Sequence, residues 1–225
     1  MKKPPERITT SIPGLDKILE GGFIPGSIIL LSGEAGTGKT MLSCQFLWKN
    51  IANGMKGLYI TLQQLADNIL DDVEYIEKDL RSAVEKGTFK IVYIDIQRVK
   101  KLVEIVIEYL DEMKADLLVI DSITLFCEVT DKSIEIRYNM IKLMKELKKR
   151  NVTAILISEV PIENWSKFGV EEFVADGVIL MKAGVDVIGG SPRSLIIKKM
   201  RRTNHDMQVH PLEIDSEGIR LTKAK

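Results

Sequence analysis

The sequence has few of the residues that mark secreted or membrane proteins. It contains two cysteines, Cys44 and Cys127, which lie far apart and fit no metal-binding or redox spacing. No apolar run approaches the roughly twenty residues of a transmembrane helix. No apolar stretch follows the charged first residues to indicate a secretory signal. Cys44 is expected to be a small core residue, and we expect a cytoplasmic protein without a membrane partner.

The chain also lacks an excess of either charge, because 32 lysines and arginines balance 32 aspartates and glutamates. Nucleic-acid-binding domains usually carry a basic excess, so composition does not favour a nucleic acid as partner, although a local basic patch stays open. The sequence has two histidines and no Ser-His-Asp or Cys-His pattern of another hydrolase. With 225 residues, of which 45% are hydrophobic, we expect one domain spanning residues 1–225.

The most informative stretch is residues 32–40, SGEAGTGKT, which fits the phosphate-binding loop pattern G-x-x-x-x-G-K-[ST]. The apolar run 28–31 precedes it as a strand, and residues 41–53 follow with helical spacing. Glycines let backbone N–H groups turn toward an anion, and the helix start adds donors and a positive dipole end. We expect Lys39 to reach the β- and γ-phosphates and Thr40 to ligate Mg²⁺. The residues expected to contact ATP or ADP are Gly33, Glu34, Ala35, Gly36, Thr37, Gly38, Lys39, Thr40 and Met41.

A second nucleotide-binding feature is the apolar run 117–120, which is followed by Asp121. In phosphate-loop proteins, an acid at the carboxyl end of a core strand holds Mg²⁺. The alternative is an aspartate that only caps the end of a strand. The position of Asp121, three helices after the loop, favours the metal role. We expect Ser122 to support the site through a hydrogen bond.

Strands alternate with helical segments up to residue 158, which predicts an α/β fold with a mostly parallel, twisted sheet flanked by helices. The expected strands are 27–31, 57–62, 89–94, 115–121 and 152–158, and the expected long helices are 41–53, 65–79, 99–113 and 134–150. Short helices are expected at 15–19 and around Glu171. After Glu159, short strands follow without long helices between them, at 177–182, 194–201, 209–214 and 219–221. They predict C-terminal antiparallel β-hairpins at one sheet edge. In the helix 134–150, the expected buried stripe includes Ile134, Tyr138, Ile141, Met144 and Leu147.

In this order, the segments resemble a KaiC-type domain of the RecA ATPase superfamily, and the resemblance covers nearly the whole chain. The segments that carry it are 13–16 (PGLD), 21–27 (GGFIPGS), the glycine loop, 58–62 (LYITL), 119–124 (VIDSIT), 172–178 (EFVADGV) and 199–205 (KMRRTNH). The last two are the most specific. The resemblance implies a RecA-like P-loop NTPase that binds Mg·ATP between the subunits of a homo-oligomeric ring, commonly a hexamer. One departure is Arg202, where the family usually has glycine.

The segment 199–205 is expected to supply the second half of such a shared site. On a strand, alternate side chains share a face, so Lys199 and Arg201 point the same way. If the strand runs on, Thr203 and His205 join them. In KaiC-like rings this set reaches the γ-phosphate and nucleotide of the adjacent subunit, which implies a catalytic role for the two cations. Without the resemblance, a basic, solvated edge strand is the simpler interpretation.

Gln63 and Gln64 stand where KaiC-like and RecA-like ATPases usually carry one or two glutamates that polarise the attacking water. Glutamine can orient a water by hydrogen bonding, but it is not a carboxylate base. We therefore expect the chain to bind Mg·ATP and to hydrolyse it slowly or not at all. Natural divergence and a deliberate Glu→Gln pair remain equally compatible with the sequence.

Two other functions stay open. A RecA-type recombination or repair ATPase could use Trp165 and Lys167, which lie where such proteins place DNA-contacting segments. Packing over a neighbouring surface is the alternative role for Trp165. A non-enzymatic, ATP-gated scaffold or regulator is favoured by the glutamine pair. Residues 171–173 match the autophosphorylation segment of clock-type KaiC proteins but contain no hydroxyl, so we expect no autokinase activity.

Overall fold

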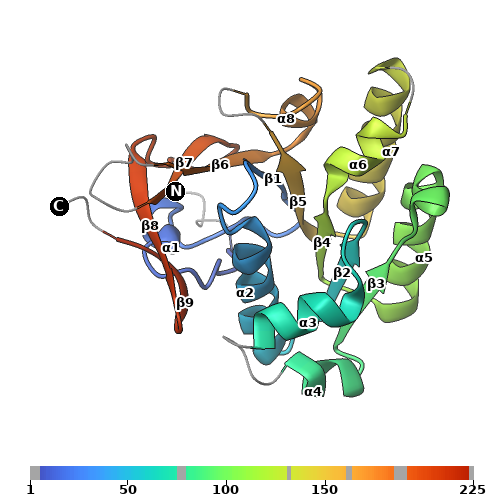
Figure 1. Ribbon diagram of the computed structural model, residues 1–225, viewed down its shortest axis with the longest axis horizontal. Helices are drawn as coiled ribbons and strands as arrows, with labels where there is room; N and C mark the ends of the chain where they lie inside the picture. Colours follow the sequence, from blue (N-terminus) through green and yellow to red (C-terminus); the bar gives the residue numbers. More distant parts are fainter. Residues whose placement is uncertain (1–5, 75–79, 131–132, 161–163, 185–191, 223–225) are drawn as a thin grey trace.

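A nine-stranded sheet forms the centre of the computed structural model, which describes residues 6–74, 80–130, 133–160, 164–184 and 192–222 (Figure 1). The strand order is β3-β2-β4-β5-β1-β6-β7-β8-β9. The strands are β1 (Ile28–Gly33), β2 (Gly57–Thr61), β3 (Phe89–Tyr93), β4 (Leu117–Asp121), β5 (Thr153–Glu159), β6 (Gly177–Ala183), β7 (Arg193–Met200), β8 (Val209–Asp215) and β9 (Gly218–Leu221). All five expected central strands are present.

Pairing within the sheet is parallel in its first part and antiparallel in its last. β1 pairs in parallel with β5 and β6, β2 with β3 and β4, and β4 with β5. β6, β7, β8 and β9 follow one another as antiparallel neighbours. Every residue of β1 and β2 is buried, as expected for strands covered by helices on both faces. The predicted mostly parallel sheet with antiparallel C-terminal strands is confirmed.

Helices cover both faces of this sheet (Figure 1). On one face, α2 (Lys39–Ala52), α3 (Ala66–Glu74) and α4 (Leu80–Glu85) pack with Ile29 and Leu31 of β1. On the other face, α5 (Leu102–Met113), α6 (Ile123–Glu128) and α7 (Ser133–Lys149) pack with Ile28 and Leu30. The remaining short helices are α1 (Leu15–Ile18), the 3₁₀ helix η1 (Ile96–Lys101) and α8 (Glu171–Val174). No helix in the described ranges is long and apolar enough to cross a membrane.

The predicted buried stripe of α7 is partly wrong. Met144 and Leu147 are buried, but Ile134, Tyr138 and Ile141 are 72%, 69% and 36% exposed. The residues that face the sheet with Met144 and Leu147 are Ile136, Met140 and Leu143. This second set also recurs at spacings of three and four, so periodicity alone does not choose between the two stripes. α7 therefore carries two apolar stripes, of which one is buried and the other is exposed.

Three short elements were not predicted, namely α4, α6 and η1. The expected helix 65–79 is represented by α3, and its last five residues lie outside the described residues. Each of the three missed elements has six residues, no more than two helical turns, and carries little periodic signal.

Candidate functional site

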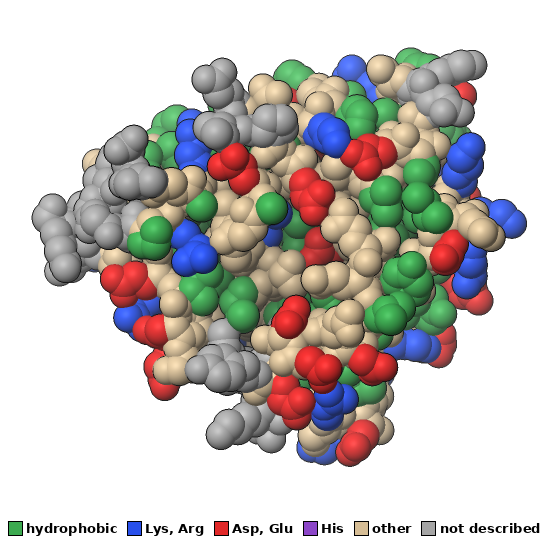
Figure 2. All heavy atoms as spheres, in the orientation of Figure 1, with side chains coloured by type: hydrophobic (Ala, Val, Ile, Leu, Met, Phe, Trp, Pro, Cys, Tyr) green, Lys and Arg blue, Asp and Glu red, His purple; other side chains and the backbone are tan. Residues whose placement is uncertain are grey.

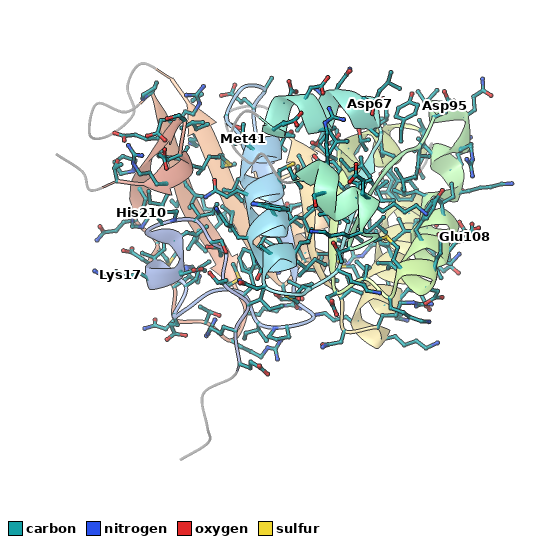
Figure 3. The ribbon with its side chains drawn as sticks, turned by 90° about the horizontal axis from the view of Figure 1, so that it is seen from below. Lys17, Met41, Asp67, Asp95, Glu108 and His210 are labelled. Carbon is teal, nitrogen blue, oxygen red and sulfur yellow. The ribbon has the colours of Figure 1, made fainter. Side chains whose placement is uncertain are left out.

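A cavity of about 480 Å³ opens at the carboxyl ends of β1, β2, β4 and β5. Ligands of open α/β sheets bind at this edge, outside the carboxyl ends of the parallel strands. The cavity is lined by Ala35, Gly36, Gly38, Lys39, Thr40, Met41, Thr61, Gln63, Gln64, Asp72, Asp121, Glu159, Arg193 and Ile214. Met41, in the first turn of α2, lies on the same side of the molecule as Asp67 of α3 (Figure 3). The cavity thus brings together the glycine loop, Asp121 and the glutamine pair.

The glycine loop connects β1 to α2 in a conformation that its glycines allow. Gly36 and Gly38 have φ values of 75° and 99°, in the left-handed region that favours glycine. The hydroxyl of the buried Thr37 donates a hydrogen bond to the Glu34 carbonyl at 2.9 Å, which closes the loop on itself. The loop leads directly into the N-terminus of α2, where backbone N–H groups and the helix dipole favour an anion.

Lys39 is the first residue of α2, and it places a cation in the cavity wall. Its Nζ donates a hydrogen bond to the Glu34 carbonyl at 2.7 Å, and its side chain is largely buried. Burial lowers the pKa of Lys39, and the carboxylates of Glu159, Asp121 and Glu34 oppose this effect. Because burial penalises the charged form, an anionic ligand in the cavity would stabilise the protonated lysine.

Asp121 is the acceptor of two hydrogen bonds at the floor of the cavity. Its Oδ2 accepts from Thr40 Oγ1 at 2.8 Å and from the Tyr59 hydroxyl at 2.7 Å. Burial raises the pKa of Asp121, and these two hydrogen bonds oppose the rise. The role of Tyr59 was not predicted. The available signal was a tyrosine within an otherwise apolar strand, where a buried hydroxyl needs a hydrogen-bond partner.

The Thr40 hydroxyl and the Asp121 carboxylate form an oxygen pair that fits Mg²⁺. No cluster of three or more His, Cys, Asp or Glu side chains that could hold a metal occurs in the described part of the chain. This sparse protein ligand set suits Mg²⁺, which binds through one or two carboxylates, substrate phosphates and waters. Ser122 follows Asp121 through a cis peptide, and its hydroxyl accepts a weak hydrogen bond from Gln63 Nε2 at 3.5 Å rather than contacting Asp121.

Gln63 and Gln64 both line the cavity, and among the described residues only the Gln63 side chain forms a hydrogen bond with another lining residue. Gln63 Nε2 lies 3.4 Å from Glu159 Oε2. Thr61 Oγ1 donates to the Gln64 carbonyl at 2.8 Å, which fixes the turn after β2. A cavity role for Glu159 was not predicted, although the residue follows a buried strand in the same way as Asp121 does.

Lys199 and Arg201 do not line this cavity. Lys199 Nζ donates to the carbonyls of Glu172 and Ala175 at 2.9 and 2.6 Å, at the end of α8. Burial lowers the pKa of Lys199, and the neighbouring Arg201 lowers it further. Arg201 is exposed, and its Nη1 lies 3.6 Å from Asp176 Oδ1. Within one subunit, the basic segment and the glycine loop are therefore separate.

The strand does not run on to Thr203 and His205, which corrects that part of the sequence interpretation. β7 ends at Met200, and residues 201–202 form a turn. Arg202 has a φ of 58°, a left-handed conformation that glycine adopts at lower cost, which gives a physical reason for glycine at this position. Thr203 Oγ1 accepts a hydrogen bond from Arg7 Nη1 at 3.0 Å. Neither residue shares a strand face with Lys199.

Trp165 and Lys167, the two residues considered for DNA contact, lie beside a basic and an acidic side chain respectively. Trp165 is partly exposed, with Lys198 Nζ 5.7 Å from its ring centre, and Lys167 pairs with Glu128. On the face shown in Figure 2, acidic side chains gather over α3 and α4, and basic side chains are scattered singly. The acids of these two helices are Asp67, Asp71, Asp72, Glu74 and Glu85. This face offers no continuous basic surface among the described residues.

The two cysteines and His210 do not line the cavity. Cys44 and Cys127 are free and buried, and burial raises the pKa of both thiols. His210 Nε2 lies 3.6 Å from Asp206 Oδ2 on the side of α1 and the C-terminal strands, near Lys17 (Figure 3). These positions agree with structural roles.

Comparison with known proteins gives a consistent result over nearly the whole chain. A family model described as the KaiC ATPase matches residues 8–225. A UPF0273 protein of Pyrococcus horikoshii is 33% identical over 233 residues, which covers 95% of this chain and 92% of that protein. The circadian clock oscillator protein KaiC 1 of Synechocystis is 30% identical over 236 residues, covering 98% of this chain and 45% of that protein. The crystal structure of a KaiC-like protein from Pyrococcus horikoshii superposes with a TM-score of 0.88 at 33% identity, covering 98% of this chain and 100% of that one.

Proposed function

Because the chain belongs to the KaiC family of ATPases, we propose that it binds Mg·ATP in the cavity at the glycine loop and hydrolyses it slowly or not at all. The observation that carries this proposal is the convergence of Lys39, Thr40 and Asp121 on one cavity. A cation, a hydroxyl and a carboxylate at a helix N-terminus are the groups that a magnesium-bound triphosphate requires.

Each group has a separate task in the proposed complex. The glycine loop and the start of α2 hold the phosphates through backbone N–H groups. Lys39 neutralises the charge of the β- and γ-phosphates. Thr40 and Asp121 would hold Mg²⁺, which neutralises phosphate charge when it is bound. Gln63 and Gln64 can orient a water by hydrogen bonding but cannot accept its proton as a carboxylate does.

We further propose that the chain assembles into a ring, as a hexamer, in which Lys199 and Arg201 reach the nucleotide of the neighbouring subunit. Neither residue lines the cavity of its own subunit, which supports an action between subunits. A hollow at Arg201 with both apolar and basic lining residues supports a contact with another chain, because Ile141 and Phe173 line it and are exposed. Light scattering with Mg·ATP should give a multiple of the 25.3 kDa chain mass, and a monomer with and without Mg·ATP would contradict the ring.

The function is tested by measuring ATP binding and phosphate release in the chain and in a Gln63→Glu/Gln64→Glu variant. We expect both to bind Mg·ATP with similar affinity, because the loop and the metal ligands are unchanged. Phosphate release should be about 100-fold faster in the glutamate variant, because a glutamate at the family's usual position both orients the water and accepts its proton. Equal and fast release from both proteins would disprove impaired hydrolysis, and an absence of ATP binding would disprove the site itself.

The glutamine pair also favours a second function, that of an ATP-gated scaffold or regulator in which the nucleotide orders the oligomer and is not consumed. Bound ATP with no phosphate release, together with an ATP-dependent mass, would identify this function.

A DNA-dependent recombinase is not favoured, because the net charge is zero. Salt-dependent DNA binding would favour the recombinase again.

We propose that the protein is located in the cytoplasm, because its two buried free cysteines suit a reducing compartment.

A further inference from the structure

Glu159 is the carboxylate that faces Gln63 across the cavity. It is the last residue of β5, and its Oε2 lies 3.4 Å from Gln63 Nε2. The same Gln63 nitrogen lies 3.5 Å from Ser122 Oγ. Glu159, Gln63 and Lys39 all line the same cavity. An acid therefore stands beside the position from which the usual glutamate is missing.

The backbone around Glu159 is fixed relative to the glycine loop. The Glu159 N–H donates to Thr124 Oγ1 at 2.8 Å, and the Val160 N–H donates to the Gly33 carbonyl at 3.3 Å. In the parallel pairing of β1 with β5, Glu159 lies opposite Gly33, where the loop begins. The pairing of β1 with β5 therefore fixes the distance between the backbones of Glu159 and Gly33 at the cavity edge.

The carboxylate of Glu159 is available for a water molecule. Its side chain is exposed, and among the described residues the carboxylate accepts only the hydrogen bond from Gln63. An ionised carboxylate has about four lone-pair positions, so it retains free acceptors. Asp121 instead already accepts hydrogen bonds from Thr40 and Tyr59 and is assigned to Mg²⁺, and Asp72 lines the cavity from α3 with no hydrogen bond to Gln63 among the described residues.

Glu159 also acts on the lysine that is assigned to the phosphates. Among the three carboxylates that raise the pKa of Lys39 against the effect of burial, Glu159 has the largest influence, ahead of Asp121 and Glu34. A general base must reach the attacking water, and Glu159 lines the same cavity as Lys39, in which the γ-phosphate is expected.

We propose that Glu159 is the general base of ATP hydrolysis in this chain, with Gln63 orienting the water; this role rests on the function proposed above. The water oxygen forms a bond to the γ-phosphorus while the bond from that phosphorus to the β–γ bridging oxygen breaks. One water proton passes to the Glu159 carboxylate, and the electron pair of the broken bond leaves with ADP. Glu159 then returns the proton to phosphate or solvent, so turnover continues slowly without Gln63 or Gln64 accepting a proton.

The test compares Glu159→Gln in the chain and in the Gln63→Glu/Gln64→Glu background. In the chain, we expect single-turnover phosphate release to fall about 100-fold, as for loss of a general base. The dissociation constant for Mg·ATP should stay within about threefold, since Glu159 is not assigned to hold phosphate, and this corresponds to less than about 0.7 kcal/mol. In the glutamate background, the same change should slow release less than about fivefold, because another carboxylate is present. Glu112→Gln, which removes an exposed carboxylate on α5, is the matched control and should change nothing.

A second readout does not depend on turnover. Mg·ADP with aluminium fluoride mimics the γ-phosphate and its attacking water, and Glu159→Gln should reduce its trapping while leaving Mg·ADP binding unchanged. If the chain binds no ATP, the proposed function fails and the role of Glu159 fails with it. If ATP binds but Glu159→Gln alters neither phosphate release nor trapping, only the role of Glu159 is overturned. An equal loss in both backgrounds would show a structural effect and would also overturn it.

Discussion

Replacing Lys39 by alanine is expected to weaken Mg·ATP binding by about 100-fold, which corresponds to about 2.7 kcal/mol and lies within the range for hydrogen bonds to charged groups. Lys39 lines the cavity and follows the last glycine of the loop, so its Nζ is the cation placed for the phosphates. The loss should appear in a titration with a fluorescent ATP analogue in the presence of Mg²⁺.

The same variant should fold normally. Burial lowers the pKa of Lys39, so the charged side chain does not gain stability from its surroundings in the absence of a ligand. We therefore expect the melting temperature without nucleotide to remain equal or to rise slightly. Lys86→Ala, which removes an exposed lysine after α4, is the control and should keep the parent affinity. If Lys39→Ala binds Mg·ATP as tightly as Lys86→Ala does, the cavity is not the nucleotide site.

The second large effect is expected for Gly33→Ala. A Cβ at Gly33 would lie 2.4 Å from the carbonyl oxygen of Met181, the residue paired with it in β6, and 3.1 Å from Thr37 Oγ1. The Met181 carbonyl belongs to the sheet backbone, so relief of this contact requires β1 and β6 to separate or the loop to shift. We expect a loss of about 3 kcal/mol in the free energy of unfolding, at the upper end of overpacking effects. ATP affinity should fall as well.

Gly36→Ala provides a matched control within the same loop. Gly36 has a φ of 75°, but a Cβ there would meet no heavy atom within 4 Å. Its expected cost is only that of a left-handed alanine, about 1 kcal/mol. Chemical denaturation of both variants measures the difference. Equal stability of Gly33→Ala and Gly36→Ala would mean that the close approach of β6 does not constrain the loop.

Most of the fold could be predicted from the sequence, because its elements carry strong local signals. The strands of the parallel sheet are buried on both faces and are nearly continuous apolar runs, as in 117–120. The exposed stripe of α7 could not be predicted, because Ile134 and Tyr138 have the same periodic spacing as Ile136 and Met140. Which stripe is buried depends on the packing of the whole helix against other elements, such as α5 and α8, and no local pattern contains that information.

The candidate site was predictable where a motif specifies it and not where only the fold brings residues together. Lys39, Thr40 and Asp121 follow from sequence patterns, and the structure places them around one cavity. Tyr59 and Glu159 were missed because their neighbours in the site come from other strands. Thr203 and His205 were placed on a strand face that ends earlier, since the left-handed Arg202 forms a turn that composition does not reveal.

The hydrogen bonds of Asp176 affect how readily Arg201 can move. Asp176 Oδ2 accepts from the Ile28 N–H at 2.9 Å and from Lys148 Nζ, while the Arg201 side chain makes only the long 3.6 Å ion pair to Oδ1 among the described residues. The guanidinium is half exposed and its contact with the largely buried Asp176 is longer than a hydrogen bond, so this pair constrains the Arg201 side chain weakly. If Arg201 turns toward a neighbouring subunit, Asp176 keeps Lys148 as its counter-charge and keeps its hold on the start of β1. The reorganisation energy of that movement is therefore small, and the strand that carries the glycine loop remains in place.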